Sequence, residues 1–403
     1  MKIRSITYFL NPKYPLDETA LRKAGEFLVQ ARATYEAAGY PVQTTRLASI
    51  PFPILLNGKT SNLPRLAQEL TELLPQINVA YASLGPALIE FPESYTFIAE
   101  AIAASENIFF SGVAADKKNG ISLQAIQACA RIIQQASTIT PDGFANLRFA
   151  ALANVKAGSP FFPAAYHDKD EPAFAIATES ADLAVKAFCG GGQTLDDGRR
   201  ALTAEISKHG QAIAQIATTI FSKIKFIGID FSLAPFPDDE HSLGGAVEKM
   251  GVPKIGLHGS LAAAAILTGA IDRADFPHTG FSGFMQPILE DSILAKRAAE
   301  ETLTIKDALL YSAVCGTGLD TVPLPGDSSA EQIAPLLLDL SVLAMRLDKP
   351  LTARLMPVPG KRAGDATNFD FGFFANSRVM KLDSAPLKFP LGGNESFSIN
   401  VKR

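Results

Sequence analysis

Tryptophan is absent from this 403-residue chain, cysteine occurs only three times and histidine only five times. The cysteines, Cys129, Cys189 and Cys315, are too few and too far apart for a disulfide framework or a cysteine-rich zinc site. No two histidines form the His-Glu-x-x-His pattern of zinc peptidases. We therefore expect the cysteines to serve mainly as small buried hydrophobic residues.

The chain also lacks an excess of basic charge and any long apolar run. It has 37 Lys and Arg against 41 Asp and Glu, a net charge of −4, so we expect no nucleic-acid partner. No charged-then-apolar leader opens the sequence, and no apolar run reaches the roughly 18 residues of a membrane span. We expect a soluble, cytoplasmic protein with no membrane partner, whose partner is a small-molecule ligand.

Three motifs of familiar sites are missing. The sequence has no Gly-x-Gly-x-x-Gly after its first apolar run, no Gly-x4-Gly-Lys-Ser/Thr and no Gly-x-Ser-x-Gly. The segment Cys189-Gly190-Gly191-Gly192 has the glycines of a phosphate-binding loop but no lysine after it. We interpret it as a hinge before the long helix expected over 194–221, which we expect to be interrupted at Gly210.

Apolar, β-branched runs alternate with helical patterns along nearly the whole chain. This alternation predicts a mainly parallel sheet that helices cover on both faces. A sheet of roughly ten or eleven strands tends to curl or split, so we expect closure into a barrel. No linker divides the chain, which predicts a single α/β barrel domain over 1–403 with an irregular tail from 360 to 403 packed on it. The expected strands are 3–10, 42–47, 79–83, 108–113, 147–155, 173–178, 226–231, 254–257, 284–289, 319–324 and 351–358.

One element occurs twice, about ninety residues apart. Gly228-Ile229-Asp230 precedes Pro235-Phe236-Pro237-Asp238-Asp239, and Gly318-Leu319-Asp320 precedes Pro323-Leu324-Pro325-Gly326-Asp327. An apolar run that ends in an acid and a proline-stiffened loop is typical of a strand exit, where α/β proteins place their chemistry. We expect Asp230 and Asp320 to share one mouth, as ligands of a divalent cation or as acid and base, or else to be structural. For Asp239 and Asp327 we expect helix capping.

Polar side chains gather in other expected strand–helix loops. Ser232 follows Asp230 and either binds a ligand or bonds its own turn. His258 stands before the helix that begins at Ser260, where backbone N–H groups can hold an anion; the alternative is a residue that simply precedes the helix cap. Cys315 lies among glycines at a helix end, where a thiol can be exposed and reactive or simply buried. Two further expected loops carry polar side chains of this kind, Tyr166 and His167 in the first and His278 to Ser282 in the second.

The same segments resemble a family of bacterial and archaeal proteins labelled domain of unknown function 711. Pro160 to His167 is similar to its Asn-Pro-Phe-x-Ala-Gly-(Ala/Ser)-(Tyr/Phe)-His segment, although Pro163 and Ala165 depart from that pattern. Asp230 to Pro237 resembles its Asp-x-Ser-Leu-Ala-Pro-x-Pro segment. The other similar segments, which extend the resemblance over essentially the whole chain, are Ile3 to Thr7, His258 to Ser260, Val314 to Asp320 and Pro325 to Asp327.

The resemblance implies a ten-stranded α/β barrel of the kind found in pyruvate formate-lyase and ribonucleotide reductase, and it implies no established reaction. In those radical enzymes, a glycine in an Arg-Val-x-Gly-Tyr type of segment near the C-terminus carries the radical. Here the tail reads Phe369-Asp370-Phe371-Gly372-Phe373 and has no such segment. We therefore expect no glycyl radical.

Three hypotheses follow for the function. The first is a barrel enzyme that acts on a small polar or anionic metabolite by acid–base or metal-assisted chemistry. The second is a non-catalytic small-molecule-binding or regulatory protein that uses the same mouth, and the third is a redox role for Cys315. A divalent metal is an open option as cofactor, and a homodimer is the default expectation. The candidate catalytic residues are His167, Asp230, His258, Cys315 and Asp320. The candidate substrate-binding residues are Tyr166, Ser232, Ser260, His278 and Ser282.

Overall fold

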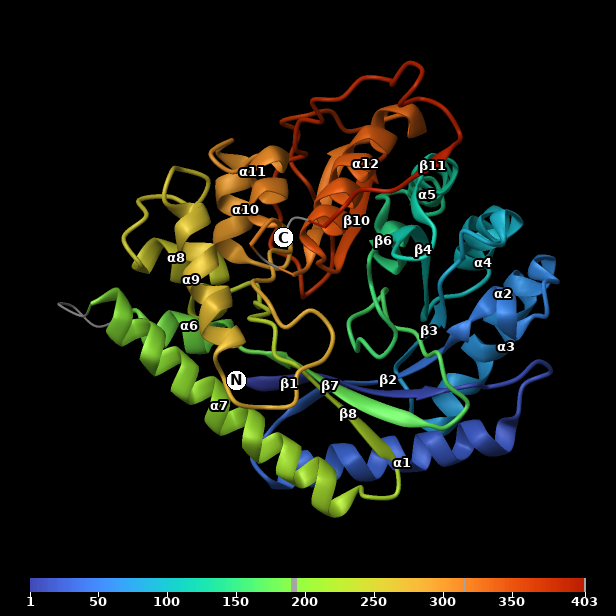
Figure 1. Ribbon diagram of the computed structural model, residues 1–403, viewed down its shortest axis with the longest axis horizontal. Helices are drawn as coiled ribbons and strands as arrows, with labels where there is room; N and C mark the ends of the chain where they lie inside the picture. The colour runs from blue at the N-terminus through green and yellow to red at the C-terminus, as the bar shows by residue number, and fades with distance from the viewer. Residues whose placement is uncertain (190–193, 315, 402–403) are drawn as a thin grey trace.

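The computed structural model describes residues 1–189, 194–314 and 316–401 and shows a mixed α/β fold (Figure 1). The strands found there are β1 Lys2–Leu10, β2 Val42–Pro51, β3 Tyr81–Gly85, β4 Ile108–Asp116, β5 Gly120–Ser122, β6 Phe149–Ala153, β7 Ala173–Glu179, β8 Lys225–Asp230, β9 Gly318–Pro325, β10 Leu351–Val358 and β11 Ser396–Phe397. The α-helices are α1 Glu18–Ala37, α2 Phe52–Leu55, α3 Leu63–Leu73, α4 Ile98–Ala103, α5 Leu123–Ser137, α6 Ala181–Ala187, α7 Leu195–Ile220, α8 Leu243–Lys249, α9 Ser260–Asp272, α10 Ser292–Ala299, α11 Ile305–Tyr311 and α12 Ala330–Leu347.

All the strands within the described ranges belong to one mixed sheet. The order along it is β8-β7-β1-β2-β3-β4-β6-β10-β9, with β5 attached to β4 and β11 attached to β5. Most neighbours along the main path are parallel, as the alternation predicts, but β1 pairs antiparallel with β7 and β6 pairs antiparallel with β10. Helices surround the outside of the curved sheet, with α1 and α7 at the bottom of Figure 1 and α5 and α12 at the top.

The sheet is not closed, so the closed ten-stranded barrel is not confirmed. Its edge strands are β8 and β9, and the segment 277–289 lies between them. The amide of Ile229 donates to the Pro277 carbonyl over 2.8 Å, and the amide of Ile288 donates to the Asp320 carbonyl over 3.0 Å. This segment contains the expected strand 284–289, which is wrong. Pro287 lacks an amide donor and Ser282 has a φ of 41°, so a continuous ladder cannot form.

A second expected strand, 254–257, is also wrong. It holds only one isolated bridge, between Ile255 and Leu257, within a turn. Gly256 in this segment has a φ of 107°, which breaks the extended conformation. The expected interruption of the long helix at Gly210 is wrong as well, because α7 runs without a break through this residue. A Cβ at Gly210 would lie 2.6 Å from Phe276 Cβ, so this glycine permits close packing between segments rather than a break.

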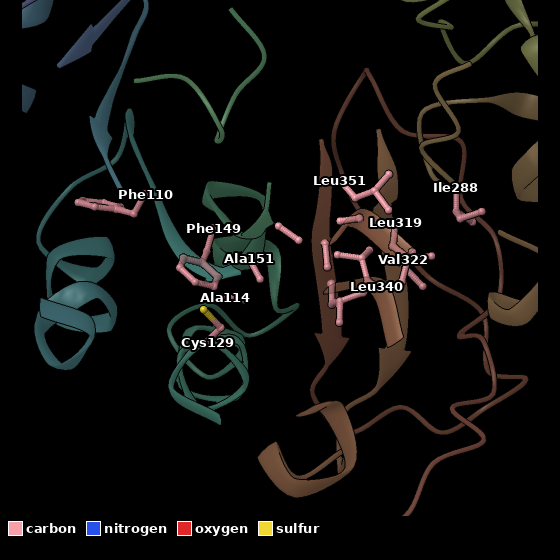
Figure 2. Close-up of a cluster of buried hydrophobic side chains, with 14 of the residues drawn as sticks. Phe110, Ala114, Cys129, Phe149, Ala151, Ile288, Leu319, Val322, Leu340 and Leu351 are labelled. Atoms are coloured by element: carbon pink, nitrogen blue, oxygen red, sulfur yellow. The ribbon is translucent and has the colours of Figure 1, made fainter. Parts of the chain in front are cut away.

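The core lies between the sheet and the outer helices. On α1, the apolar stripe of Leu21, Ala24, Leu28, Ala31 and Tyr35 is fully buried, and Asp17 caps the helix by accepting from the Ala20 amide. Figure 2 shows part of the same core, in which the sulfur of Cys129 lies near Phe149 on one side and Leu319 and Val322 lie together on the other. Cys129 is 0% exposed, and burial raises the pKa of its thiol, as expected for a small hydrophobic residue.

The helix caps that follow the two copies of the doubled element are not the predicted residues. Asp238, not Asp239, caps the short turn that follows, accepting from the amides of Glu240 and His241. Asp239 instead accepts a hydrogen bond from Ser292 Oγ over 2.8 Å. The helix after the second copy is capped by Ser329, not by Asp327.

The C-terminal tail after β10 is irregular, as expected, except for the short strand β11. Phe369, Phe374 and Val379 pack with Met356 and Leu289 in an apolar cluster at one end of the sheet. The red tail passes over α12 in Figure 1 before it reaches β11 beside α5. Across the described ranges, no helix is both long enough and apolar enough to cross a membrane.

Candidate functional site

A cavity of about 350 Å³ lies against β1, β2, β8 and β10, and we call it the central pocket. Its wall brings together residues that are up to 369 positions apart, from Arg4 to Phe373. The charged side chains that line it are Arg4, Arg46, Glu106, Arg148, Asp230, Glu290 and Arg354. The aromatic side chains that line it are Tyr81, Phe109, Phe144, Phe161, Phe162, Phe371 and Phe373. The pocket therefore combines a group of charges with an aromatic wall.

One side of the central pocket is an ion-pair network centred on Glu290. Its carboxylate accepts from Arg4 Nη2 and from Arg354 Nη2, the latter over 3.0 Å. Arg354 Nε also donates to Asp320 Oδ1 over 2.5 Å, and Arg4 lies 4.0 Å from Glu179. Burying these charges is tolerable only because each has an opposite partner.

In this network, the pKa of Glu290 is lowered and the pKa of Asp320 is raised. Burial alone would raise the pKa of Glu290, but the positive charges of Arg4 and Arg354 outweigh it, so the pKa lies below its usual range. Burial raises the pKa of Asp320, which Arg354 opposes and the negative charge of Glu290 reinforces. Asp320 is 0% exposed, and within the described residues its Oδ2 atom has no hydrogen-bond partner.

Arg46 differs from the other arginines of this wall, because among the described residues it donates neither to a carboxylate nor to a backbone carbonyl. Its Nε donates to Thr44 Oγ1 over 2.9 Å and its guanidinium lies 4.9 Å from the centre of the Phe162 ring, but among the described residues it forms no ion pair. Burial, together with repulsion from Arg4 and Arg354, lowers the pKa of Arg46 to about 9. That value keeps the guanidinium charged at pH 7. Arg148 also has no ion pair there, but it donates to the carbonyls of Ile102 and Ser105.

Asp230 closes another part of the wall, at the end of β8. Its carboxylate accepts from the amides of Phe281 and Ser282 over 2.9 and 3.0 Å and from Ser232 Oγ over 2.6 Å. Gly280, with a φ of 64°, brings this loop so close that a Cβ there would overlap Asp230 Oδ2. Burial raises the pKa of Asp230, while these donors oppose the rise.

Three of the sequence-predicted residues meet at the central pocket. Asp230 and Ser232 line it, and Asp320 lies directly behind Arg354. The two acids of the doubled element thus lie in the same region, although Asp320 is the third residue of β9 and not its last. Its side chain acts through an arginine of the neighbouring strand.

Tyr166 and His167 lie outside the central pocket. The Tyr166 hydroxyl donates to the Val155 carbonyl over 3.0 Å, and burial raises its pKa. His167 Nε2 lies 2.9 Å from the Glu171 carbonyl, and burial lowers the pKa of the imidazole. Both rings hold the loop that carries Phe161 and Phe162, and neither lines the pocket.

The remaining predicted residues occupy other places. His258 is exposed, and Ser260 Oγ donates to the Leu257 carbonyl at the start of α9. His278 and Ser282 line a separate hollow beside Lys156 and Asp348. Cys315 and residues 190–193, which include the glycines directly after Cys189, lie outside the described residues. No cluster of three or more metal-ligating His, Cys, Asp or Glu side chains occurs in the part of the chain that the structure describes.

Sequence reasoning missed the arginines, although the sequence contains a signal for them. Arg4, Arg46 and Arg354 each interrupt an apolar strand pattern, and a charge within a buried strand requires a partner or a ligand. Glu290 likewise follows the apolar run that ends at Leu289. The partners could not be assigned because Arg4 and Glu290 are 286 residues apart.

The model of the family described as Uncharacterised ACR (DUF711) matches residues 1–376 of the chain. A UPF0210 protein of Pyrobaculum aerophilum is 30% identical over 371 residues, which are 88% of this chain and 81% of that protein. A UPF0210 protein of Methanopyrus kandleri is 29% identical over 399 residues, with 93% and 88% covered. A UPF0210 protein of Pyrobaculum arsenaticum is 33% identical over 278 residues, with 66% and 61% covered.

Proposed function

The chain belongs to the Uncharacterised ACR (DUF711) family, and we propose that it binds and transforms a small anionic metabolite in the central pocket. The observation that carries this proposal is the half-buried Arg46 guanidinium, which feels the charge of Glu290 but forms no ion pair with a carboxylate of the described residues. An unpaired charge in a partly dry cavity is costly, and a bound anion would remove that cost. Guanidinium groups suit carboxylate and phosphate ligands, because two N–H donors can bind two oxygens in parallel.

The pair Asp230 and Ser232 is our candidate for the acid–base part of the reaction. Both side chains line the central pocket, and the Ser232 hydroxyl donates to the carboxylate over 2.6 Å. A carboxylate whose pKa is raised by burial is closer to the pH at which it can both accept and release a proton. In this proposal, Ser232 faces the ligand and Asp230 takes its proton.

The hydrogen bonds of Asp230 also favour a second candidate function, a non-catalytic binding or regulatory protein. The carboxylate already accepts from two backbone amides and one hydroxyl, which is the pattern of a structural anchor. If the carboxylate only positions the loop 279–283, the same pocket binds the anion without turnover. Both candidate functions use Arg46 to bind the anion, and they differ in whether Asp230 transfers a proton or only positions the loop.

Two measurements separate the candidates. A panel of small carboxylates and phosphates is tested for binding by calorimetry and for consumption by mass spectrometry, with wild type and Arg46→Met. We expect Arg46→Met to weaken binding at least about tenfold, since a hydrogen bond to a charged group contributes about 1.5–3 kcal/mol. Arg65→Met on exposed α3 is the control and should leave binding unchanged. Equal binding by wild type and Arg46→Met would refute the proposal.

Turnover is then tested with Ser232→Ala and Asp230→Asn on any ligand that binds. The enzyme candidate requires that both variants lose turnover while Ser232→Ala keeps its affinity. Binding of a panel member without consumption by the wild type supports the second candidate instead. In that case the acid–base role of Asp230 is wrong.

Four finer expectations remain proposals or predictions as well. We propose that the segment 277–289, with its bonds to β8 and β9, completes a barrel-like wall around the central pocket. The likeness of this wall to the pyruvate formate-lyase barrel, the homodimer and the cytoplasmic location stay predictions. Sedimentation analysis tests the dimer, and a crystal structure with ligand tests the wall.

A further inference from the structure

Aromatic rings from several separate parts of the chain line the central pocket, and they say more about its ligand than the charges do. Tyr81 and Phe109 come from adjacent strands, and Phe162 comes from the loop before β7. Phe371 and Phe373 come from the C-terminal tail, with only Gly372 between them. The fold thus collects rings at a cavity, which a site for a purely polar ligand does not need.

These rings contact each other. Two pairs pack edge to face: the ring centres of Tyr81 and Phe109 are 5.5 Å apart, and those of Phe109 and Phe162 are 5.4 Å apart. The ring centres of Phe371 and Phe373 are 5.2 Å apart, with the ring planes tilted by 45°. Such pairs hold aromatic side chains in fixed orientations, so the wall is organised before a ligand arrives.

The tail rings are held at the pocket by their neighbours. Phe374 packs in the apolar cluster with Leu289 and Met356 and is 8% exposed, while Phe371 and Phe373 are half-buried. Phe373 also lies 5.8 Å from Phe236, in the loop after β8. The tail therefore contributes two partly open rings to the cavity from an anchored segment.

The charges specify how many anionic groups the ligand carries. Arg4 and Arg354 share Glu290, and Arg354 also binds Asp320, so both are already neutralised. The donors of Arg148 are engaged by backbone carbonyls. Among the described residues of the wall, this leaves Arg46 for a ligand, which corresponds to one anionic group. That cation lies against the Phe162 ring, so the anion and the aromatic wall are adjacent.

The volume limits the ligand to a small molecule. At about 350 Å³ the cavity lies near the lower end of the range for small-molecule sites, roughly 300–1,000 Å³. A polyhydroxylated or multiply charged aliphatic molecule would leave its polar groups against the rings without hydrogen bonds. A flat ring with one acidic substituent fits both parts of the wall.

We infer that the ligand of the central pocket is a planar aromatic molecule that carries one anionic group, a carboxylate or a phosphate. The inference rests on the proposed function, because it assumes that Arg46 binds an anion. It adds that the rings of Phe371 and Phe373 contribute to recognition of the ligand body. The charge is bound at the strands, and the ring is bound against the aromatic wall and tail.

The test uses four probes, phenylacetate, cyclohexylacetate, succinate and phenyl phosphate, with binding measured by calorimetry at one ionic strength. We expect phenylacetate or phenyl phosphate to bind at least about threefold tighter than cyclohexylacetate and about tenfold tighter than succinate. Comparison of the affinities for phenylacetate and phenyl phosphate shows whether the anionic group is a carboxylate or a phosphate. Arg46→Met should weaken the binding of both aromatic probes at least about tenfold.

Two tail variants supply the second readout. Phe373→Leu should weaken the affinity for the aromatic probes by about threefold to tenfold. The affinity for succinate should stay within twofold of wild type, and the unfolding midpoint should stay close to that of wild type. Phe389→Leu is the matched control, because this ring lies in the same tail, is 85% exposed and does not line the pocket.

The outcomes separate the inference from the proposed function. If succinate or cyclohexylacetate binds as tightly as the aromatic probes and Arg46→Met weakens that binding at least about tenfold, the aromatic ligand class is wrong and the anion site stands. Unchanged affinity of the aromatic probes in Phe373→Leu likewise overturns the recognition role of that ring. If no probe shows binding that depends on Arg46, both the inference and the proposed function fail.

Discussion

Arg354 Nε donates to Asp320 Oδ1 over 2.5 Å, and the side chains of both residues are almost completely buried. The two residues lie on the neighbouring strands β9 and β10, 34 positions apart. Asp320 was a site candidate from the doubled element, but its contact with the central pocket passes through Arg354. Its main role is therefore to hold a charge in place, which leads to the first prediction.

Asp320→Asn should lower the free energy of unfolding by about 3–5 kcal/mol, because it leaves part of the Arg354 charge buried without a partner. The measurement is urea unfolding at pH 7. The double variant Asp320→Asn with Arg354→Met should lose less than the sum of the single variants. Glu69→Gln, in the exposed pair with Arg65, is the control and should cost about 0.5 kcal/mol or less. A loss below about 1 kcal/mol for Asp320→Asn would contradict the buried ion pair.

Glu290 should make stability sensitive to acid. Its pKa in the folded protein lies below the ordinary value of about 4.3, because Arg4 and Arg354 outweigh the effect of burial. A depressed folded pKa stabilises the protein above the unfolded pKa, and that contribution disappears as the pH falls through the folded pKa. We expect the unfolding free energy of the wild type to fall more steeply below about pH 4.5 than that of Glu290→Gln.

Urea midpoints at several pH values between 3 and 7 measure this difference. The raised pKa values of Asp230 and Asp320 act in the opposite direction. Glu290 contributes to the raised pKa of Asp320, so the comparison between wild type and Glu290→Gln reports Glu290 together with its effect on Asp320. Parallel curves for the two proteins over this range would contradict the prediction.

Asp230→Asn should loosen the loop 279–283. The carboxylate accepts from the Phe281 and Ser282 amides, and an amide side chain presents a donor where one acceptor is needed. We expect hydrogen exchange at these two amides to accelerate at least about tenfold, in line with a loss of about 1.5–3 kcal/mol per charged hydrogen bond. Ser232→Ala removes only the hydroxyl donor and should change the exchange of these amides much less.

Gly210→Ala should destabilise the protein, against the usual preference for alanine within a helix. Alanine normally gains about 1 kcal/mol over glycine there. At Gly210, however, the new Cβ would lie 2.6 Å from Phe276 Cβ, so we expect a net loss of about 1–3 kcal/mol. Gly269→Ala in α9 is the matched control, since its Cβ would meet only the mobile end of Arg273, and it should be neutral or stabilising. Thermal unfolding of both variants gives the comparison.

Local patterns predicted the helix α1 from its single buried stripe and the strands β1, β4, β7 and β10 from their apolar, β-branched runs. The failures at 254–257 and 284–289 have local causes that periodicity does not register. Gly256 has a positive φ, and Pro287 has no amide to donate to a ladder. The predicted helix break at Gly210 was wrong for a different reason, since only the close contact with Phe276 explains why a glycine stands there.

The candidate site was predicted in part. The acids Asp230 and Asp320 and the hydroxyl of Ser232 were identified because a strand followed by an acid and a proline is a local signal. The histidines were not brought to the central pocket, since His167 bonds a nearby carbonyl and His258 is exposed. Arg46 and the tail ring Phe373 were missed because neither has a local partner that reveals its role.

The sequence by itself determined the alternation of strands and helices, the burial of the apolar stripes and the membership of the family. These properties depend on residues within a few turns of each other, or on similarity along the whole chain. Only the tertiary structure decided that Arg46 forms no ion pair with the described residues and that aromatic rings stand beside it. The reason is physical: the free energy of a buried charge depends on partners such as Glu290, which folding brings to Arg4 across 286 residues of chain.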